Sequence, residues 1–278
     1  MIREPYGVHI RGNYSLAGVI KQLESISQAA EDLSAEVDRP QGKWRFLNWA
    51  DAAERQLRRY LVDPSWADGF ITPRYMHLHQ DRDGLGKDWA TFNVLLRAEI
   101  DFQHERMIGL MAAMKELSGI AQRPGEIAVL DTNAYLHATP FEQVEWCKEL
   151  QRKPVRIVLP VEVLSELDKV KYMKGDRSDR ADKVLKVLDG YPDLFEQKAA
   201  VVRQNVTIEV FAFEDGHRRA ENMDEEIIGR ALLLQQAADR PVTVVTDDRS
   251  MRVRAGVRGL QVWPIPDHLL LRKRVTAQ

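Results

Sequence analysis

The sequence predicts an α/β fold for the C-terminal half of the chain, with a mostly parallel sheet flanked by helices, preceded by an α-helical bundle domain. Up to residue 120, apolar side chains recur every three or four positions, which is typical of amphipathic helices. After residue 126, short β-branched runs alternate with helix-like segments, as in a parallel sheet covered on both faces. We therefore expect a helical domain at 1–120, a linker at 121–126 and an α/β domain at 127–278.

The composition is that of a soluble globular protein, with 278 residues, 44% hydrophobic and 29% charged. No apolar run approaches the roughly 18–20 residues that span a bilayer, and the first residues do not resemble a signal peptide, so no membrane association is expected. Cys147 is the only cysteine, which excludes an intramolecular disulfide and fits a reducing, cytoplasmic setting. The net charge of −2 gives no overall basic footprint for nucleic acid.

Three helices are expected in the N-terminal domain. The first carries a regular apolar stripe at Leu16, Val19, Leu23, Ile26, Ala30, Leu33 and Val37, and should end at Arg39-Pro40. The second covers about 43–62, and the third covers about 88–117 with Gln103 interrupting its stripe. Between them, Pro64, Gly69 and Pro73 predict a loop region. Such a bundle is expected to dock a protein partner, build a homo-oligomer or select substrate.

In the C-terminal domain, β-branched and apolar runs predict five strands, at 127–130, 155–159, 206–213, 242–245 and 260–263. Helices are expected near 140–151, 160–173, 179–189, 223–238 and 248–255.

Acidic residues stand at the ends of the predicted strands or open the helices beside them. Asp131 follows the first strand, and Asp247 and Asp248 follow the fourth by way of Thr246. Glu166 lies in the helix after the second strand, and Asp224 opens the helix before the fourth. Because ligand sites of open α/β sheets form beyond the carboxyl ends of the strands, we expect these acids to converge.

Converging carboxylates repel one another unless they are protonated or bind a cation. Oxygen ligands select hard ions, so the predicted cofactor is Mg²⁺ or Mn²⁺, with Asp131, Glu166, Asp224, Asp247 and Asp248 as the candidate metal ligands. Such an ion activates water and steadies the leaving oxygen of a phosphodiester. The residues therefore predict metal-dependent phosphodiester hydrolysis.

Four segments of this half resemble the PIN-domain nucleases: residues 129–133 (VLDTN), 159–169 (LPVEVLSELDK), 222–227 (NMDEEI) and 245–252 (VTDDRSMR). The resemblance covers roughly residues 126–265, and the helical N-terminal half lies outside it. It implies a parallel sheet flanked by helices and a Mg²⁺- or Mn²⁺-dependent endoribonuclease, whose cleavage leaves a 5′-phosphate and a 3′-hydroxyl.

The resemblance also implies residue roles. Asp131, Glu166, Asp224 and Asp248 match the family's acidic catalytic positions, although either Asp247 or Asp248 can supply the fourth acid. Glu225 replaces Asp224 if the register slips by one residue. Three short polar side chains match positions near the metals, where they can hydrogen-bond a carboxylate: Thr132, Asn133 and Thr246.

Two basic segments flank the predicted acids and are candidates for holding phosphates. Arg249 and Arg252 follow Asp248 directly. Lys169, Lys171 and Lys174 begin a run in which basic residues recur every third position with acids between them, a pattern that equally fits a solvated helix with local ion pairs.

The predicted function is that of a metal-dependent endoribonuclease acting on RNA, with single-stranded RNA as the expected substrate. Two alternatives remain open from the sequence: a structure-specific or single-strand DNA nuclease, and an inactive PIN-like scaffold or binding module. The biological role, as a toxin, an RNA-processing enzyme or a defence effector, also remains open.

Overall fold

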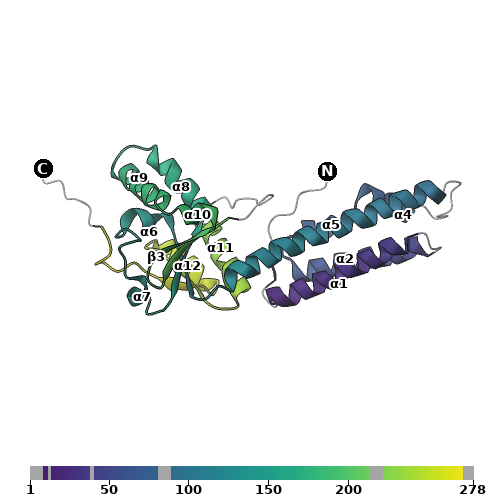
Figure 1. Cartoon of the computed structure of the whole chain (residues 1–278), viewed down its shortest axis with the longest axis horizontal. Coiled ribbons are helices and arrows are strands. Elements are labelled where there is room, and N and C mark those ends of the chain that lie inside the picture. The colour runs from purple at the N-terminus through teal and green to yellow at the C-terminus, as the bar shows by residue number, and fades with distance from the viewer. Residues whose placement is uncertain (1–8, 12–13, 38–40, 81–88, 213–221, 272–278) are drawn as a thin grey trace. The chain divides into compact units, whose positions relative to one another are not determined.

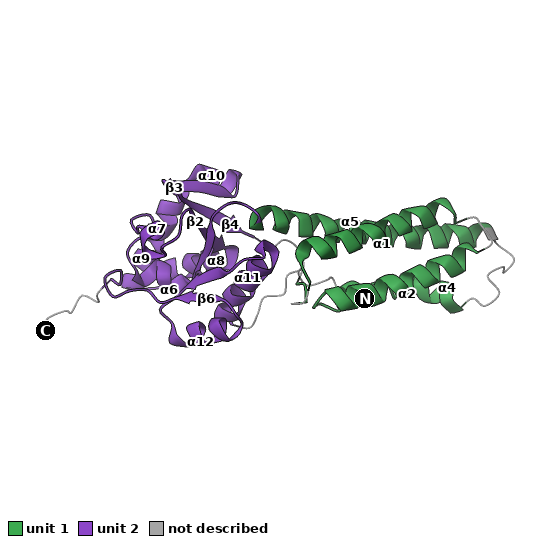
Figure 2. Cartoon of the chain, turned by 90° about the horizontal axis from the view of Figure 1, so that it is seen from below, with its two compact units in different colours: residues 1–121, 215–218 green, residues 122–214, 219–278 purple. Residues whose placement is uncertain are grey.

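The computed structural model describes residues 9–11, 14–37, 41–80, 89–212 and 222–271. The chain divides into two compact units, which Figure 2 shows in separate colours. Unit 1 comprises residues 1–121 with 215–218, and unit 2 comprises residues 122–214 and 219–278. Figure 1 labels helices and strands of the two units.

Unit 1 consists of helices in its described part: α1 (Leu16–Ala35), α2 (Gly42–Tyr60), α3 (Ser65–Asp68), α4 (Pro73–Gln80) and α5 (Trp89–Ala121). The hydroxyl of Ser15 caps α1 by accepting a hydrogen bond from the amide of Gly18. The predicted stripe of α1 is buried, and this helix packs along α5. Helix α2 packs on α3 and α4. The predicted end of the first helix, at Arg39-Pro40, lies outside the described residues.

The region around Pro64, Gly69 and Pro73 was expected to be a loop, and this expectation is wrong. Pro64 precedes α3 and Pro73 is the first residue of α4. Proline is favourable at a helix start, where its missing N–H has no helical partner to lose, so these prolines mark beginnings rather than a loop.

Gln103, which interrupts the apolar stripe of α5, is fully buried and belongs to a polar network. Its side-chain amide donates to the carbonyl of Gly69 at 3.0 Å and to Glu99 at 2.8 Å. Its oxygen accepts from Arg106, and Glu99 accepts from Arg74 at 2.9 Å. The interruption is therefore a buried site whose polar groups are hydrogen-bonded.

Unit 2 is built on a six-stranded sheet with the order β3-β4-β2-β1-β5-β6. The strands are β1 (Glu126–Leu130), β2 (Val155–Pro160), β3 (Ala199–Arg203), β4 (Val206–Phe211), β5 (Val242–Val245) and β6 (Gln261–Trp263). All neighbours pair in parallel except β3, which is antiparallel to β4 at one edge. The predicted class, a mostly parallel sheet flanked by helices and preceded by helices, is confirmed.

Helices surround this sheet: α6 (Thr132–His137), α7 (Trp146–Glu149), α8 (Val161–Lys171), α9 (Asp176–Asp189), α10 (Pro192–Glu196), α11 (Met223–Ala238) and α12 (Arg249–Val257). The central strands β1 and β2 are buried along nearly their whole length, as expected for strands covered on both faces. The helix predicted at 140–151 is shorter, because only α7 forms there.

The strand order places a topological switch point between β1 and β5. From β1 the chain crosses to β2 on one side, and it later returns to β5 and β6 on the other side. The register sets Leu130 opposite Val245, so the residues that follow these two strands emerge side by side. A crevice at the carboxyl ends of the strands is the usual ligand position in such sheets.

No helix among the described residues combines the length and the apolar character needed to cross a membrane.

Candidate active site

Asp131 lies at the switch point, directly after β1, and is 3% exposed. It caps the N-terminus of α6, where one carboxylate oxygen accepts a hydrogen bond from the amide of Ala134 at 2.6 Å. The other oxygen accepts a hydrogen bond from the hydroxyl of Thr246, the residue after β5. The fold therefore holds this carboxylate in one orientation from two strand ends.

Burial raises the pKa of Asp131 to about 6, because the charged form loses its hydration. The hydrogen bonds from Thr246 and Ala134 oppose this rise by stabilising the charged form. The charges of Asp224 and Asp248 add to the rise. Two further carboxylates therefore disfavour the charged form of Asp131.

Asp247 and Asp248 are placed differently. The side chain of Asp248 is half-buried and caps α12 by accepting a hydrogen bond from the amide of Met251 at 2.8 Å. Its own amide donates to the hydroxyl of Thr246 at 3.0 Å. The side chain of Asp247 is 51% exposed and meets Arg252. Asp248 is therefore the member of the pair that faces Asp131.

Asp224 stands in the first turn of α11 and pairs with Arg254 of α12. The guanidinium of Arg254 donates to Asp224 Oδ2 at 2.5 Å and to Glu225 Oε1 at 2.8 Å. Arg258 also contacts Glu225, at 2.6 Å. Burial opposes the charged form of Glu225, but the hydrogen bonds from Arg258 and Arg254 outweigh it and lower the pKa of this carboxyl. Glu225 is therefore held as an ion-pair partner, and Asp224 is the acid that acts on Asp131.

Glu166 lies in α8 and accepts a hydrogen bond from the hydroxyl of Thr132. Because Thr132 follows Asp131 directly, this contact ties α8 to the end of β1. Asn133 is half-buried in α6. The two threonines, Thr132 and Thr246, thus each hold one acidic side chain in place.

A divalent metal is the group that these residues imply, and they fit it in kind. The donors are carboxylate oxygens, which suit Mg²⁺ or Mn²⁺, and the mutual repulsion at Asp131 is what a cation relieves. Within the described ranges, however, no group of three acidic, histidine or cysteine side chains is gathered closely enough to hold a metal ion. The chain therefore supplies carboxylate oxygens of the right kind, but the described side chains do not group them around one point. Asp224 forms an ion pair with Arg254.

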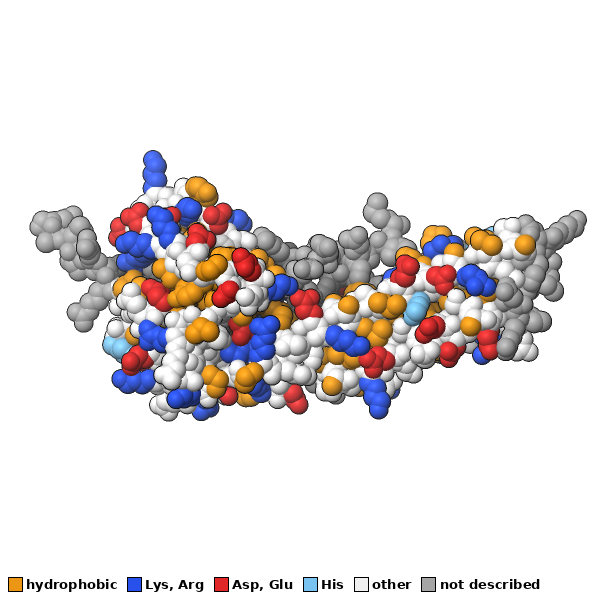
Figure 3. Space-filling model, in the orientation of Figure 1, with side chains coloured by type: hydrophobic (Ala, Val, Ile, Leu, Met, Phe, Trp, Pro, Cys, Tyr) orange, Lys and Arg blue, Asp and Glu red, His pale blue; other side chains and the backbone are white. Residues whose placement is uncertain are grey.

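The predicted phosphate-binding residues lie on two helices that carry the acids. Arg249 is exposed in the first turn of α12, and Arg252 lies one turn further. Lys169 is exposed in the last turn of α8, and Lys174 is exposed beyond its end. Lys171 is engaged by Asp182 at 3.8 Å. On the face seen in Figure 3, basic and acidic side chains alternate over α8 and α9 without a continuous basic stripe.

A buried ion-pair group between α8 and α11 was not predicted from the sequence. Arg230 bridges Glu162 and Glu226, and all three side chains are at most 5% exposed. It connects the helix that carries Glu166 to the helix that carries Asp224. The available signal was an arginine within the apolar run at 227–234, which indicates a buried pair.

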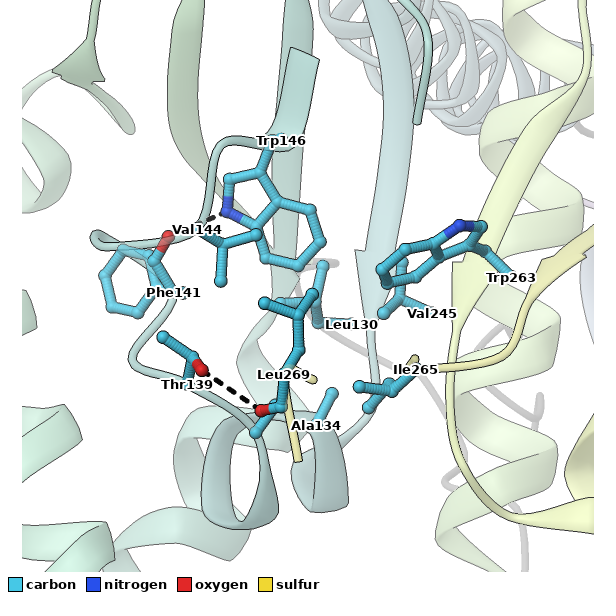
Figure 4. Close-up of a pocket in the computed structure, with 11 residues that line it drawn as sticks. Leu130, Ala134, Thr139, Phe141, Val144, Trp146, Val245, Trp263, Ile265 and Leu269 are labelled. Carbon is cyan, nitrogen blue, oxygen red and sulfur yellow. Dashed lines mark hydrogen bonds between the residues drawn. The ribbon is translucent and has the colours of Figure 1, made fainter. Parts of the chain in front are cut away.

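A small apolar pocket lies beside the acidic edge, between the ends of β1, β5 and β6 and the segment 138–146 (Figure 4). Trp146 and Trp263 meet edge to face across it, with ring centroids 6.1 Å apart. Its volume is about 10 Å³, which is room for about one water molecule. The pocket is a packing gap, and the chemistry of this edge lies with the carboxylates.

Comparisons with known proteins match this half of the chain. A family model described as a PIN domain matches residues 128–265, a range that includes Asp131, Glu166, Asp224 and Asp248. No curated protein matches the chain. A solved structure described as a domain of a functionally unknown protein from Methanocaldococcus jannaschii DSM 2661 is 15% identical with a TM-score of 0.35, covering 55% of this chain and 99% of that one.

Proposed function

Because residues 128–265 of this chain form a PIN domain, we propose that the protein is a metal-dependent endoribonuclease that hydrolyses phosphodiester bonds of RNA. The predicted family of the C-terminal half is confirmed, and PIN domains are generally nucleases that use divalent metals. The substrate, the metal and the cleavage itself are the proposal.

One observation carries the proposal: three acids, Asp131, Asp224 and Asp248, interact electrostatically near the switch point of the sheet. They come from β1, α11 and the start of α12, and the charges of the latter two add to the raised pKa of the first. A buried carboxylate such as Asp131, whose charged form is disfavoured by burial and by two neighbouring acids, is typical of a site that binds a cation.

The residues of the chain have separate tasks in this proposal. Asp131 must be charged to bind a cation, and Thr246 and the amide of Ala134 favour its charged form. The hydroxyl of Thr132, the residue after Asp131, donates a hydrogen bond to Glu166 and so holds that carboxylate in place. A divalent cation held by these carboxylates supplies Lewis acidity, which activates water and offsets the negative charge of the phosphate.

The proposed substrate is single-stranded RNA, held by cationic side chains next to the acids. Arg249 and Arg252 are the preferred contacts, because the helix that carries them begins at Asp248. Lys169, Lys171 and Lys174 form a second candidate contact at the end of α8. Cationic side chains of this kind also bind the phosphates of DNA, so cleavage assays on both RNA and DNA decide which is the substrate.

An inactive binding module is a second candidate, and one observation favours it. The described residues contain no ready-made group of three metal ligands, and Asp224 is paired with Arg254. A protein of this second kind would bind no Mn²⁺ in calorimetry.

The helical unit is proposed to join a protein partner or a second copy of the chain. Apolar side chains on it are exposed, among them Trp44 at 59% and Val94 at 67%. Light scattering of the purified protein measures whether the chain associates with itself. If the protein stays a monomer at every concentration, the partner must be a different protein. The cytoplasm is the proposed location, since the chain has one cysteine and needs no oxidising compartment.

The first experiment is cleavage of end-labelled single-stranded RNA, and of DNA with the same sequence, by the full-length protein. We expect cutting with Mn²⁺, none with EDTA, and none with Asp131→Asn. Asp168→Asn is the matched control, because Asp168 is an exposed acid two positions from Glu166 on the same helix. Equal cleavage by wild type and Asp131→Asn would refute the proposed site. Cleavage of the DNA but not of the RNA would show that DNA, and not RNA, is the substrate.

A further inference from the structure

Arg254 makes a bridging contact at the edge of the candidate site. Its guanidinium, on α12, binds one oxygen of Asp224 at 2.5 Å and one oxygen of Glu225 at 2.8 Å. The three side chains are 29–34% exposed, so the contact is open to solvent and to ions. A single guanidinium thus neutralises a candidate metal ligand.

The two acids that Arg254 bridges are compensated unequally. Glu225 also receives Arg258, at 2.6 Å. In the part of the chain that the structure describes, Arg254 is the cation that pairs with Asp224. Release of Arg254 would therefore leave Glu225 with a counter-ion, while Asp224 would need a new one.

We propose that Arg254 is a built-in counter-ion that a divalent cation displaces from Asp224, and that the released guanidinium then binds a phosphate of the nucleic acid. The proposal rests on the metal site proposed above. A cation at Asp224 repels a guanidinium on the same carboxylate, and partly exposed ion pairs are weak enough to be exchanged. A free guanidinium in turn binds phosphate with two parallel hydrogen bonds.

The position of Arg254 suits this second task. It lies on α12 with Arg249 and Arg252, the preferred phosphate contacts, and that helix begins at Asp248. A side chain that leaves Asp224 therefore stays among cations beside the acids. Metal binding would add one phosphate contact to the site, so metal and nucleic acid would strengthen each other's binding.

The first test measures Mn²⁺ affinity without activity, from the free Mn²⁺ signal in electron paramagnetic resonance. The full-length wild type is compared with Arg254→Ala, and with Arg258→Ala as a control that removes a neighbouring arginine, one that pairs with Glu225. We expect Arg254→Ala to bind Mn²⁺ about three- to tenfold more tightly, since a competing ion pair is lost. We expect Arg258→Ala to change the affinity less than about twofold, because Glu225 is not one of the proposed metal ligands. Unchanged or weaker Mn²⁺ binding by Arg254→Ala would overturn the displacement.

The second test measures binding of a phosphorothioate single-stranded RNA, which resists hydrolysis, by fluorescence anisotropy. Without metal, Arg254→Ala should bind it as the wild type does, because Arg254 is engaged by Asp224. With saturating Mn²⁺, the variant should bind about three- to tenfold more weakly, which is the loss of one phosphate contact. An equal loss in both conditions, or no loss in either, would overturn the release step. Circular dichroism and thermal unfolding verify that each variant is folded.

The failure of this inference differs from the failure of the proposed function. If the wild type binds Mn²⁺ and Arg254→Ala binds it equally, the counter-ion role is wrong and the metal site stands. If neither protein binds Mn²⁺, the metal site is wrong and the counter-ion role falls with it. Mn²⁺ binding that appears only in Arg254→Ala would support the counter-ion role.

Discussion

The hydroxyl of Thr246 donates a hydrogen bond to Oδ2 of Asp131, although the two residues are 115 positions apart in the sequence. The contact exists because β1 and β5 pair in parallel with Leu130 opposite Val245, so the next residue of each strand leaves the sheet at the same place. Thr246 is fully buried and Asp131 nearly so. This pair links the fold of the sheet to the charge state of the site.

Replacing Asp131 should stabilise the metal-free protein while abolishing cleavage. The pKa of Asp131 is raised from 3.8 to about 6, so folding disfavours its charged form. The penalty is absent below pH 3.8, grows as the pH rises toward about 6, and is complete above it. Asp131→Asn removes it, which should raise the free energy of unfolding at pH 7 by about 2–3 kcal/mol.

Thermal unfolding of wild type and Asp131→Asn with EDTA, from pH 4 to pH 8, measures this difference. The advantage of the variant should shrink as the pH falls toward 4. A difference that stays constant across this range would show that the titration of Asp131 does not cause it.

Removing the hydroxyl of Thr246 should shift the pH dependence of metal binding. The hydrogen bond from Thr246 lowers the pKa of Asp131, so Thr246→Val should raise this pKa further above its ordinary value. Mn²⁺ binding then requires a higher pH, by roughly one unit, since a hydrogen bond to a charged group contributes about 1.5 kcal/mol. Calorimetric Mn²⁺ titrations from pH 5 to pH 8 check the shift. Thr246→Ser keeps the hydroxyl and should bind as wild type does.

The same substitution should affect the adjacent acids Asp247 and Asp248 to very different extents. Asp248→Asn keeps the cap of α12, because asparagine is a good N-cap, but removes a charge that faces Asp131. We expect the rate of RNA cleavage to fall at least about 100-fold. Asp247→Asn alters an exposed side chain and should change the rate less than about threefold. Equal losses in the two variants would contradict the placement of the pair.

The buried pair of Arg156 and Glu209 should matter for stability and not for catalysis. Arg156 binds both oxygens of Glu209, at 2.8 and 2.6 Å, near the amino end of β2 and away from the acids. In Arg156→Met, the buried carboxylate of Glu209 keeps only the half-exposed Arg123 as an ion-pair partner among the described residues. The free energy of unfolding, measured by chemical denaturation, should fall by about 3–5 kcal/mol. The double variant Arg156→Met, Glu209→Leu should recover most of this loss. A double variant as unstable as the single one would refute an electrostatic cause.

Much of the α/β half was predictable because its elements have strong local signals. The predicted bounds of β5 (Val242–Val245) and α11 (Met223–Ala238) agree with the structure, and those of β1 and β2 differ by one residue. Buried parallel strands are short β-branched runs, and α11 is preceded by Asn222, whose side chain caps it.

The elements that were missed have weak or misleading signals. Strand β3 is a short antiparallel edge strand joined to β4 by two residues, of which Asn205 has a positive φ of 62°. Asparagine between two apolar runs is a recognisable hairpin turn, and this was the available signal. Helix α6 is only six residues long, and its start is fixed by Asp131, the same side chain that serves the site.

The sequence by itself determined which acids stand at strand ends and helix starts, because strand pattern, capping and chain order are local properties. Only the tertiary structure decided three contacts. The charge of Asp248 acts on Asp131, Thr246 donates a hydrogen bond to Asp131, and Arg254 forms an ion pair with Asp224. These contacts depend on the register of β1 with β5 and on the packing of α12 near α11. Both bring together residues distant in the chain, where sequence spacing carries no information on which side chains meet.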